Sequence, residues 1–153
     1  MKMVMSFMLA VCLAAGITGA AFAAERATAK EAEAMVKKAV DSFKANGKEK
    51  TIAAINDPKG EFMQGELYAF VFDFDIICLA HPANPKLVGK NMADLKDAEG
   101  KSFMKEMAAM AKAGGGWVDY KWTNPETKKI QDKSSYVTSI PGENVFVGCG
   151  IYK

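Results

Sequence analysis

Few residues of this chain have the chemistry that catalysis or metal binding requires. Of its 153 residues, only His81 is a histidine, and beyond residue 23 only Cys78 and Cys149 are cysteines. One histidine and two separated cysteines do not match the spacing of a zinc site, and no Cys-x-x-Cys-His haem motif is present. Cys78 and His81 cannot form a nucleophile–base pair on one strand, because their odd offset puts them on opposite faces. We therefore expect neither a metal nor a cofactor.

One short motif resembles that of an enzyme. Asp73-Phe74-Asp75 is similar to the Asp-x-Asp opening of haloacid-dehalogenase-like phosphatases, where the first Asp is the nucleophile and the second the acid/base. That fold needs a parallel sheet with crossovers of a dozen or more residues, and here the apolar segment 76–80 follows too soon. The downstream acidic pair that would hold magnesium is also missing. We expect no enzyme, with a phosphatase using Asp73 and Asp75 as an alternative.

The residues better suited to holding a small molecule are aromatic side chains on predicted strands. In the segment 117–122, Tyr120 and Trp122 point to one face and Trp117 to the other, because side chains alternate along a strand. Tyr68 and Phe70 share a face of an earlier strand in the same way. Such faces either line a cavity or fill a core, and the sequence leaves both readings open.

Four polar residues could contact a ligand. Lys133 could pair with a carboxylate, or it could be a solvated lysine. It precedes Tyr136 by three residues, so the two share a face only if a bulge interrupts the strand. His81 and Asn84 could reach a ligand from the loop at Pro82, or they could serve only to fix that loop.

An anion would have to be bound without arginine. Arg26 is the only arginine and lies at the start of the predicted domain, so a bidentate guanidinium clamp is nearly excluded. Lysine, tyrosine and backbone amides would then hold a small acid or an amino-acid-like ligand, although an uncharged ligand would fit as well. With 20 Lys and Arg residues against 18 Asp and Glu residues, the charge balance does not indicate nucleic acid as a partner.

Hydrophobic spacing and turn residues predict the elements that position these side chains. Thr28 and Glu31 form a capping box, and apolar residues recur at helical spacing as far as Phe43, which predicts a long helix that Gly47 ends. Further helices are predicted at 49–55 and 103–111, and strands at 67–72, 76–80, 117–123, 130–140 and 144–152. This order predicts an α+β domain with the long N-terminal helix packed on a five-stranded antiparallel sheet. The other face of the sheet would leave room for a pocket.

The N-terminal segment is typical of a secretory signal. A basic start is followed by an apolar run at 3–17 and by Ala21-Phe22-Ala23, which matches the small-x-small cleavage rule. We therefore expect a signal peptide at 1–23 and a single periplasmic domain at 24–153. A membrane anchor is the alternative, but the run is shorter than the ~20 residues that a spanning helix needs. Export would permit a Cys78–Cys149 disulfide, and otherwise both cysteines would be small buried side chains.

Several segments, taken together and in order, point to a known family. They are 65–73 (GELYAFVFD), 79–85 (LAHPANP), 87–91 (LVGKN), 116–122 (GWVDYKW), 133–136 (KSSY) and 148–152 (GCGIY). This series resembles the single Cache domain of type 2, the PAS-like extracellular sensor module of bacterial receptors, and covers about 29–153. One departure is Ile76, which stands where the family usually has glycine at a hairpin. Because a β-branched residue disfavours positive φ, this turn is expected to differ.

The resemblance implies a periplasmic sensor domain that binds a small organic acid or an amino-acid-like molecule without catalysis. It also implies signal transduction or chemotaxis through a membrane-bound receptor or kinase, with a homodimer as a possible assembly. The chain shows no second membrane segment, so we expect a stand-alone version of the domain. A periplasmic interaction subunit without a ligand is a further alternative. The residues expected to bind the ligand are Tyr68, Phe70, His81, Asn84, Trp117, Tyr120, Trp122, Lys133 and Tyr136.

Overall fold

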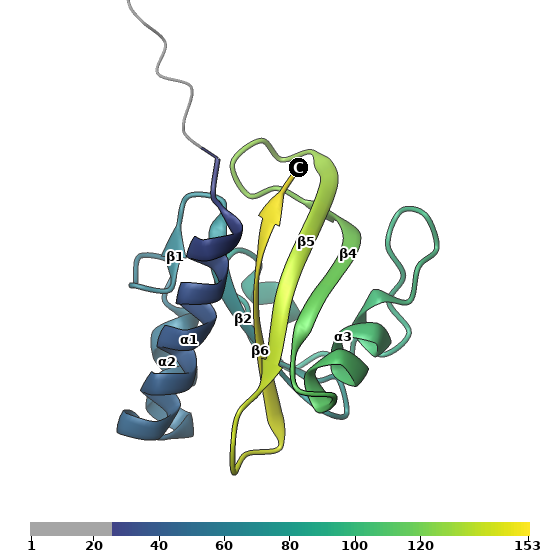
Figure 1. Cartoon of the computed structure of the whole chain (residues 1–153). Helices are drawn as coiled ribbons and strands as arrows, with labels where there is room; N and C mark the ends of the chain where they lie inside the picture. The colour runs from purple at the N-terminus through teal and green to yellow at the C-terminus, as the bar shows by residue number, and fades with distance from the viewer. Residues whose placement is uncertain (1–25) are drawn as a thin grey trace, which may run out of the picture.

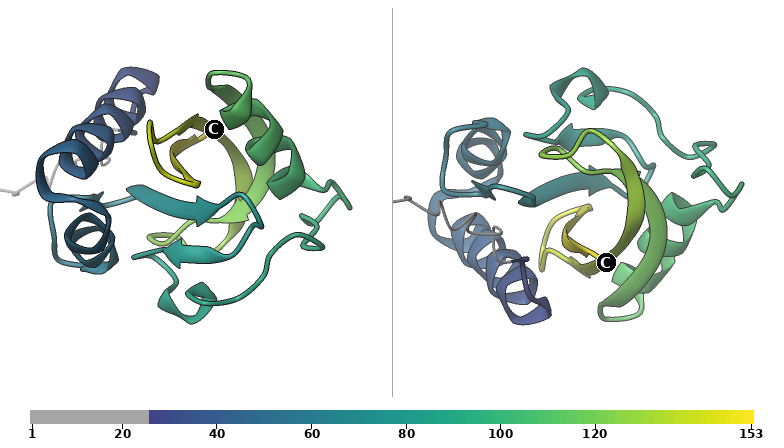
Figure 2. Two further views of the ribbon diagram at one scale, coloured as in Figure 1. Left: turned by 90° about the horizontal axis from the view of Figure 1, so that it is seen from below. Right: turned by 90° about the horizontal axis from the view of Figure 1, so that it is seen from above.

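A computed structural model of the chain describes residues 26–153, so the predicted signal peptide at 1–23 lies outside the described residues. The helices are α1 (Ala29–Asn46), α2 (Lys48–Asn56) and α3 (Phe103–Lys112), with a short 3-10 turn at Pro85–Leu87. The strands are β1 (Met63–Gln64), β2 (Leu67–Asp73), β3 (Cys78–Ala80), β4 (Gly116–Thr123), β5 (Ile130–Ser139) and β6 (Val145–Tyr152). Helices α1 and α2 lie on one side of the sheet and α3 lies on the other (Figures 1 and 2).

The sheet is antiparallel and its order is not the order of the chain. Its strands run β1-β2-β6-β5-β4, and β3 pairs with β2 as well. The C-terminal strand β6 therefore lies in the middle, between β2 and β5. The five predicted strands are all present, and the two-residue β1 is an addition that the sequence pattern did not indicate. The α+β class and the antiparallel sheet are confirmed.

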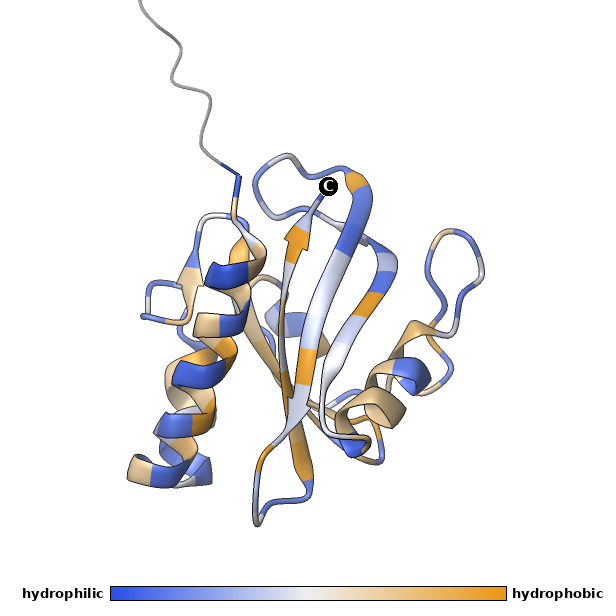
Figure 3. Cartoon of the chain, in the orientation of Figure 1, coloured by the Kyte–Doolittle hydropathy of each residue, from blue (hydrophilic) through white to orange (hydrophobic). Residues whose placement is uncertain are grey.

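Local sequence explains where α1 begins and ends. The backbone N–H of Thr28 donates to the Glu31 carboxylate at 2.7 Å, and the N–H of Glu31 donates to the Thr28 hydroxyl at 3.3 Å, which forms the predicted capping box. At the other end Gly47 takes a φ of +80° and donates its N–H to the Phe43 carbonyl. Hydrophilic and hydrophobic residues alternate along the helix (Figure 3), and the hydrophobic ones face the sheet.

The sheet separates two hydrophobic cores, because alternate residues of each strand point to opposite faces. On β6, Val145, Val147 and Cys149 pack under α1, whereas Phe146 packs on the α3 side. We call these the α1 core and the α3 core. The α1 core is completed by Ala32, Met35, Val36, Ala39, Phe43, Ile55, Phe62, Leu67, Ala69, Val71, Ala80 and Ile140. The α3 core is rich in aromatic residues and methionine, which include Tyr68, Phe70, Phe72, Met92, Phe103, Met104, Met107 and Tyr120.

The turn of the β2–β3 hairpin contains a residue in the left-handed conformation, Ile76, although the turn has no glycine. Ile76 has a φ of +63°, a conformation that costs an L-residue roughly 1–2 kcal/mol. Asp73 holds the turn, because its carbonyl accepts from the Ile76 N–H at 3.0 Å and its carboxylate from the Ile77 N–H at 2.8 Å. The Ile76 side chain is buried in the α3 core, and this burial offsets the strain.

Candidate ligand-binding site

A small apolar cavity lies on the α3 side of the sheet, between the strands, α3 and the loop that follows β3. Its volume is about 20 Å³, roughly the room for one water molecule. The lining residues are Phe70, Phe72, His81, Leu87, Met92, Leu95, Phe103, Met104, Met107, Tyr120 and Trp122. Three of the residues that we predicted from the strand pattern, Phe70, Tyr120 and Trp122, therefore meet at this cavity.

A more polar crevice adjoins the cavity. It has a volume of about 280 Å³ and is lined by Tyr68, His81, Ala83, Asn84, Trp122, Thr123, Pro125 and Lys128. His81 and Trp122 belong to both hollows, and their ring centroids are 6.2 Å apart. The two hollows thus share two aromatic side chains, and the crevice adds the hydroxyl and amide groups of Tyr68, Thr123 and Asn84 to its lining.

Lys133 is the only buried residue among the lysines, arginines and acids of 26–153, with 1% of its surface exposed. Its ammonium donates to the Tyr68 hydroxyl at 2.8 Å and lies 4.0 Å from the Tyr68 ring centroid and 4.7 Å from that of Tyr152. In the described part of the chain it forms no ion pair with any carboxylate. Burial lowers the pKa of Lys133 from 10.5 to about 7. Among the described residues this amine donates a hydrogen bond only to a phenol, and the charge of Glu66, which forms no ion pair with it, raises its pKa by less than burial lowers it.

Two glycines of β6 make room for this arrangement. A Cβ atom on Gly150 would lie 2.6 Å from Cε of Lys133 and 2.1 Å from the Ser135 hydroxyl. A Cβ atom on Gly148 would lie 2.4 Å from the Phe70 ring. The lysine side chain from β5 can thus cross β6 and reach Tyr68 on β2, because β6 has no side chain in its path.

Buried hydroxyl groups surround the lysine. Tyr120 and Tyr152 pair with Lys133 on the neighbouring strands, so the three form a row across β4, β5 and β6. The Tyr68 and Tyr152 hydroxyls lie 3.4 Å apart, and the Tyr120 hydroxyl lies 3.0 Å from that of Ser135. Burial raises the pKa of all three tyrosines well above the usual value, so each phenol keeps its proton and can donate a hydrogen bond.

His81 is a neutral imidazole in this environment. Burial, with a smaller contribution from the charge of Lys133, lowers its pKa to about 3. Its Nδ1 accepts from the Asn84 N–H at 3.0 Å, and the backbone N–H of His81 donates to the side-chain oxygen of Asn56 at 3.0 Å. With Nδ1 used as an acceptor, the remaining proton lies on Nε2, which makes that nitrogen a donor. The ring thus both fixes the loop and lines the hollows, and Asn84 lines the crevice beside it.

Comparison with known proteins identifies this arrangement. The family model of the single Cache domain 2 matches residues 17–153. The chain belongs to this family. Cache domains are periplasmic sensor domains and are generally non-catalytic. Among residues 26–153 we find no helix long and apolar enough to cross a membrane, and no cluster of three or more side chains suited to a metal ion.

The relatives of this Cache domain are signalling proteins. It is 42% identical over 85 residues to the sensor histidine kinase MctS of Rhizobium johnstonii and 30% identical over 86 residues to the methyl-accepting chemotaxis protein McpP of Pseudomonas putida. Each match covers 56% of this chain but only 18% and 16% of the relatives, so the chain spans less than a fifth of their length.

Solved structures agree with the fold. A methyl-accepting chemotaxis protein from Vibrio parahaemolyticus superposes with a TM-score of 0.69 at 27% identity, which covers 80% of this chain and 86% of the other. A second structure, from a study of carboxylic acid recognition by a Cache chemosensory domain, gives a TM-score of 0.63 at 25% identity, with coverage of 80% and 86%. These matches confirm the PAS-like sensor fold that the sequence motifs indicated.

Two predicted ligand-binding residues of the Cache domain lie away from the hollows. Trp117 and Tyr136 pack against the α1 core on the opposite face, with ring centroids 5.7 Å apart. The pairing of β5 with β4 and β6 is continuous through Lys133 and Tyr136, so no bulge brings these two residues together. The strand alternation that puts Lys133 in the site therefore excludes Tyr136 from it.

The disulfide alternative is wrong for a similar reason. Cys78 belongs to the α3 core and Cys149 to the α1 core, and both thiols are free and buried. The sheet lies between them. Burial raises the pKa of each thiol to about 12, which makes both unreactive small side chains.

The phosphatase alternative is also wrong. The Asp73 carboxylate accepts the backbone N–H of Ile77 and so stabilises a hairpin turn. Strands β2 and β3 on either side of this turn are antiparallel, whereas the phosphatase fold needs parallel strands. Asp73 is therefore a turn residue of the Cache domain.

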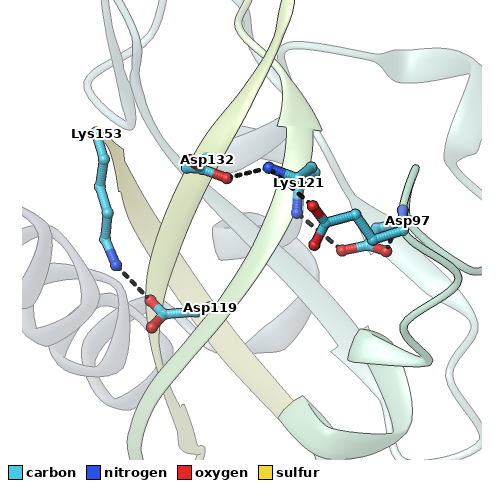
Figure 4. Close-up of polar contacts among 6 residues, drawn as sticks. Asp97, Asp119, Lys121, Asp132 and Lys153 are labelled. Carbon is cyan, nitrogen blue, oxygen red and sulfur yellow. Dashed lines mark hydrogen bonds and ion pairs between the residues drawn. The ribbon is translucent and has the colours of Figure 1, made fainter.

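The charged residues near the site pair with one another at the surface. Figure 4 shows Lys121 beside Asp132 and Lys153 beside Asp119, at 2.5 and 2.9 Å. The Asp97 carboxylate accepts the backbone N–H of Lys121 at 3.0 Å, which ties the loop after β3 to the edge strand β4. Burial acts to raise the pKa of Asp97, but hydrogen bonds from three backbone N–H groups lower it below its usual range. None of these carboxylates is paired with Lys133.

Sequence reasoning missed part of the site. Tyr152 and Ser135, together with the apolar lining residues Phe72, Leu87, Met92, Leu95, Phe103, Met104 and Met107, were not among the predicted residues. A signal for Tyr152 was present, because it shares strand parity with Gly148 and Gly150. The lining residues from the loop and α3 depend on how these segments pack, which strand parity does not determine.

Proposed function

We propose that residues 24–153 form an exported, non-catalytic sensor domain that binds a small monocarboxylate beside Lys133. The observation that carries this proposal is the buried ammonium without a carboxylate partner. A buried cation with no counter-ion is costly, and the depressed pKa of Lys133 corresponds to roughly 5 kcal/mol. An anionic ligand would supply the missing charge.

The groups around Lys133 suit a carboxylate. The phenols of Tyr68 and Tyr120 and the Nε2–H of His81 can all donate, and a carboxylate offers about four acceptor sites. None of these three donors needs to change its protonation state when the ligand binds. The site thus offers one positive charge and several neutral donors. The sheet carries no arginine, so these groups would take the role that an arginine clamp has in other carboxylate sites.

The same residues disfavour other small metabolites. An amino acid would bring an ammonium group, and neither the cavity nor the crevice has an Asp or Glu among its lining residues to receive it. A surface hollow that Lys133 also lines does contain acids, but Glu99, Asp119 and Asp132 are already paired there with Lys121 and Lys153. A dicarboxylate would need a second buried cation, which the described residues do not provide. A carboxylic acid ligand is consistent with the study of a structurally similar Cache domain.

Signalling by this domain would need a partner. We infer that residues 1–23 direct export and are removed, that the domain works in the periplasm, and that ligand occupancy is passed to a membrane-bound receptor or kinase. The homology to a sensor kinase and to a chemoreceptor supports this inference. A homodimer would be compatible with it.

Calorimetric titration of the domain with acetate, propionate, glycine and succinate tests the proposal, with Lys133→Met as the key variant. We expect the two monocarboxylates to bind the wild type, and Lys133→Met to weaken that binding at least about a hundredfold because the charge is lost. The exposed Lys129→Met is the matched control and should bind normally.

Two outcomes would contradict the proposal. Unchanged binding by Lys133→Met would show that the buried ammonium does not hold the ligand. If none of these acids releases heat or raises the melting temperature of the wild type, the domain is better described as an interaction subunit without a carboxylate ligand.

A further inference from the structure

We propose that Met104 and Met107 of α3 set the longest alkyl chain that the site accepts. This inference rests on the proposed function, because it assumes that a carboxylate is held near Lys133. The chain of such a ligand must point away from the donors, and the apolar cavity borders them through Phe70, Tyr120 and His81. The cavity is therefore the place for the hydrocarbon part of the ligand.

The cavity is small enough to discriminate between chain lengths. Its volume of about 20 Å³ accommodates a group the size of one water molecule, and so one or two carbon atoms. Each methylene that is buried should strengthen binding about fourfold, until the next one no longer fits. Affinity should therefore rise and then fall along a series of straight-chain acids.

The sheet side of the cavity cannot retreat to admit a longer chain. The Phe70 ring rests directly on Gly148, where even a Cβ atom would come within 2.4 Å of it. The ring of Tyr120 on β4 is also held in place, because it stacks on that of Phe103 at the start of α3 at 4.6 Å with an interplanar angle of 9°. Aromatic rings packed in this way keep a fixed shape.

The opposite wall is made of side chains that can be shortened. Met104 and Met107 are 3% and 1% exposed and lie on one face of α3, three residues apart. Methionine is unbranched and its thioether fills irregular gaps, so these two residues determine how far the cavity extends toward the helix. Their truncation to alanine would lengthen the cavity while the polar groups at its other end stay in place.

The experiment measures binding of acetate, propionate, butyrate and pentanoate by the wild type, Met104→Ala and Met107→Ala. We expect the wild type to prefer acetate or propionate, and each alanine variant to shift its preference toward butyrate or pentanoate, with at least a tenfold gain for the longer acids relative to acetate. Met35→Ala is the matched control, because Met35 is a buried methionine of α1 on the other face of the sheet. It should leave the preference unchanged.

The outcomes separate this inference from the proposed function. If the wild type binds the series and neither α3 variant shifts its preference relative to Met35→Ala, the role of the methionines is refuted while carboxylate binding stands. Wild-type affinity that keeps rising up to pentanoate would refute it as well. Failure of every acid to bind would refute the proposed function itself. Should one alanine variant not fold, the other decides, and Met107→Leu, which keeps the volume, must retain the wild-type preference.

Discussion

The α1 core and the α3 core are built on the same strands, yet they differ in what the strands place there. Under α1 the buried strand residues are Ala, Val, Leu and Cys, with Trp117 and Tyr136 packed at their edge and no charged group. Under α3 they contribute aromatic rings, hydroxyls, an ammonium and two glycines, and a cavity remains. Dense apolar packing is what stability requires, whereas an unpaired buried cation opposes it. The comparison indicates that α1 and its core hold the sheet in shape, while the α3 face has the cavity and the polar groups that the proposed ligand needs.

Damage to the α1 core should affect stability alone, and by the largest amount. Phe62 is fully buried there, so Phe62→Ala is expected to lower the free energy of unfolding by about 3–5 kcal/mol. Because Phe62 does not touch either hollow, the fraction that remains folded should bind a carboxylate with unchanged affinity. Chemical denaturation and calorimetric titration of the same sample check both parts. A large loss of intrinsic affinity would show that the two faces are not independent.

A methyl group added on the α3 face should lower both the stability of the domain and its affinity for a carboxylate. Gly150→Ala would drive a Cβ atom into Cε of Lys133 and the Ser135 hydroxyl, at a cost of about 1–3 kcal/mol in stability. It should also displace the ammonium and abolish carboxylate binding. Ile151→Val, on the neighbouring position of β6 that faces α1, is the control and should retain binding. Normal binding by Gly150→Ala would mean that the path of Lys133 across β6 does not matter.

The two faces of the sheet should also differ in how they make stability depend on pH. His81 has a folded pKa of about 3 against 6.5 when unfolded, so the unfolded state takes up a proton as pH falls below 6.5 and stability declines. Between pH 7 and pH 5 this group should reduce the free energy of unfolding by about 2 kcal/mol. His81→Gln should remove that part of the pH dependence, as measured by urea denaturation at several pH values. An identical dependence in the variant would contradict the assignment.

Ligand affinity should fall at high pH. Lys133 with a pKa of about 7 loses its proton as pH rises above 7, and a carboxylate needs the charged form. The dissociation constant of acetate is therefore expected to be level below pH 6, to rise about twofold by pH 7, and to approach a tenfold increase per pH unit above pH 8, as far as the pKa of Lys133 in the complex. Titration calorimetry across this range is the measurement, and a constant affinity up to pH 9 would contradict it.

The smallest effect is expected at the strained hairpin. Ile76→Gly would relieve a left-handed φ of +63° but lose a buried side chain, so stability should fall by only about 1 kcal/mol. Ile77→Gly, next to it, removes a side chain without relieving positive φ. Thermal unfolding compares the two variants, and because Ile77 is only half-buried, a loss of about 3 kcal/mol or more for Ile76→Gly, the usual cost of truncating a buried isoleucine, would argue against strain at this turn.

Strand parity predicted much of the sheet, including the faces of Tyr68, Phe70, Tyr120 and Trp122, because side chains alternate wherever pairing is regular. It also implied that Lys133 and Tyr136 lie on opposite faces. The burial of Lys133 could not be read from its own strand, since it depends on the glycines of β6, and β6 reaches the centre of the sheet only through long-range pairing. The contribution of α3 and the loop depends on packing between distant segments in the same way.

The central claim is that an anion completes the charge of Lys133, and the pKa of that residue tests it most directly. The ε-carbon chemical shift of Lys133 can be followed by NMR from pH 5 to pH 11, without ligand and with saturating acetate, and the resonance can be assigned by its absence in Lys133→Met. The account predicts a midpoint of about 7 without ligand and a rise of at least one pH unit with acetate. A midpoint that acetate leaves unchanged would contradict it.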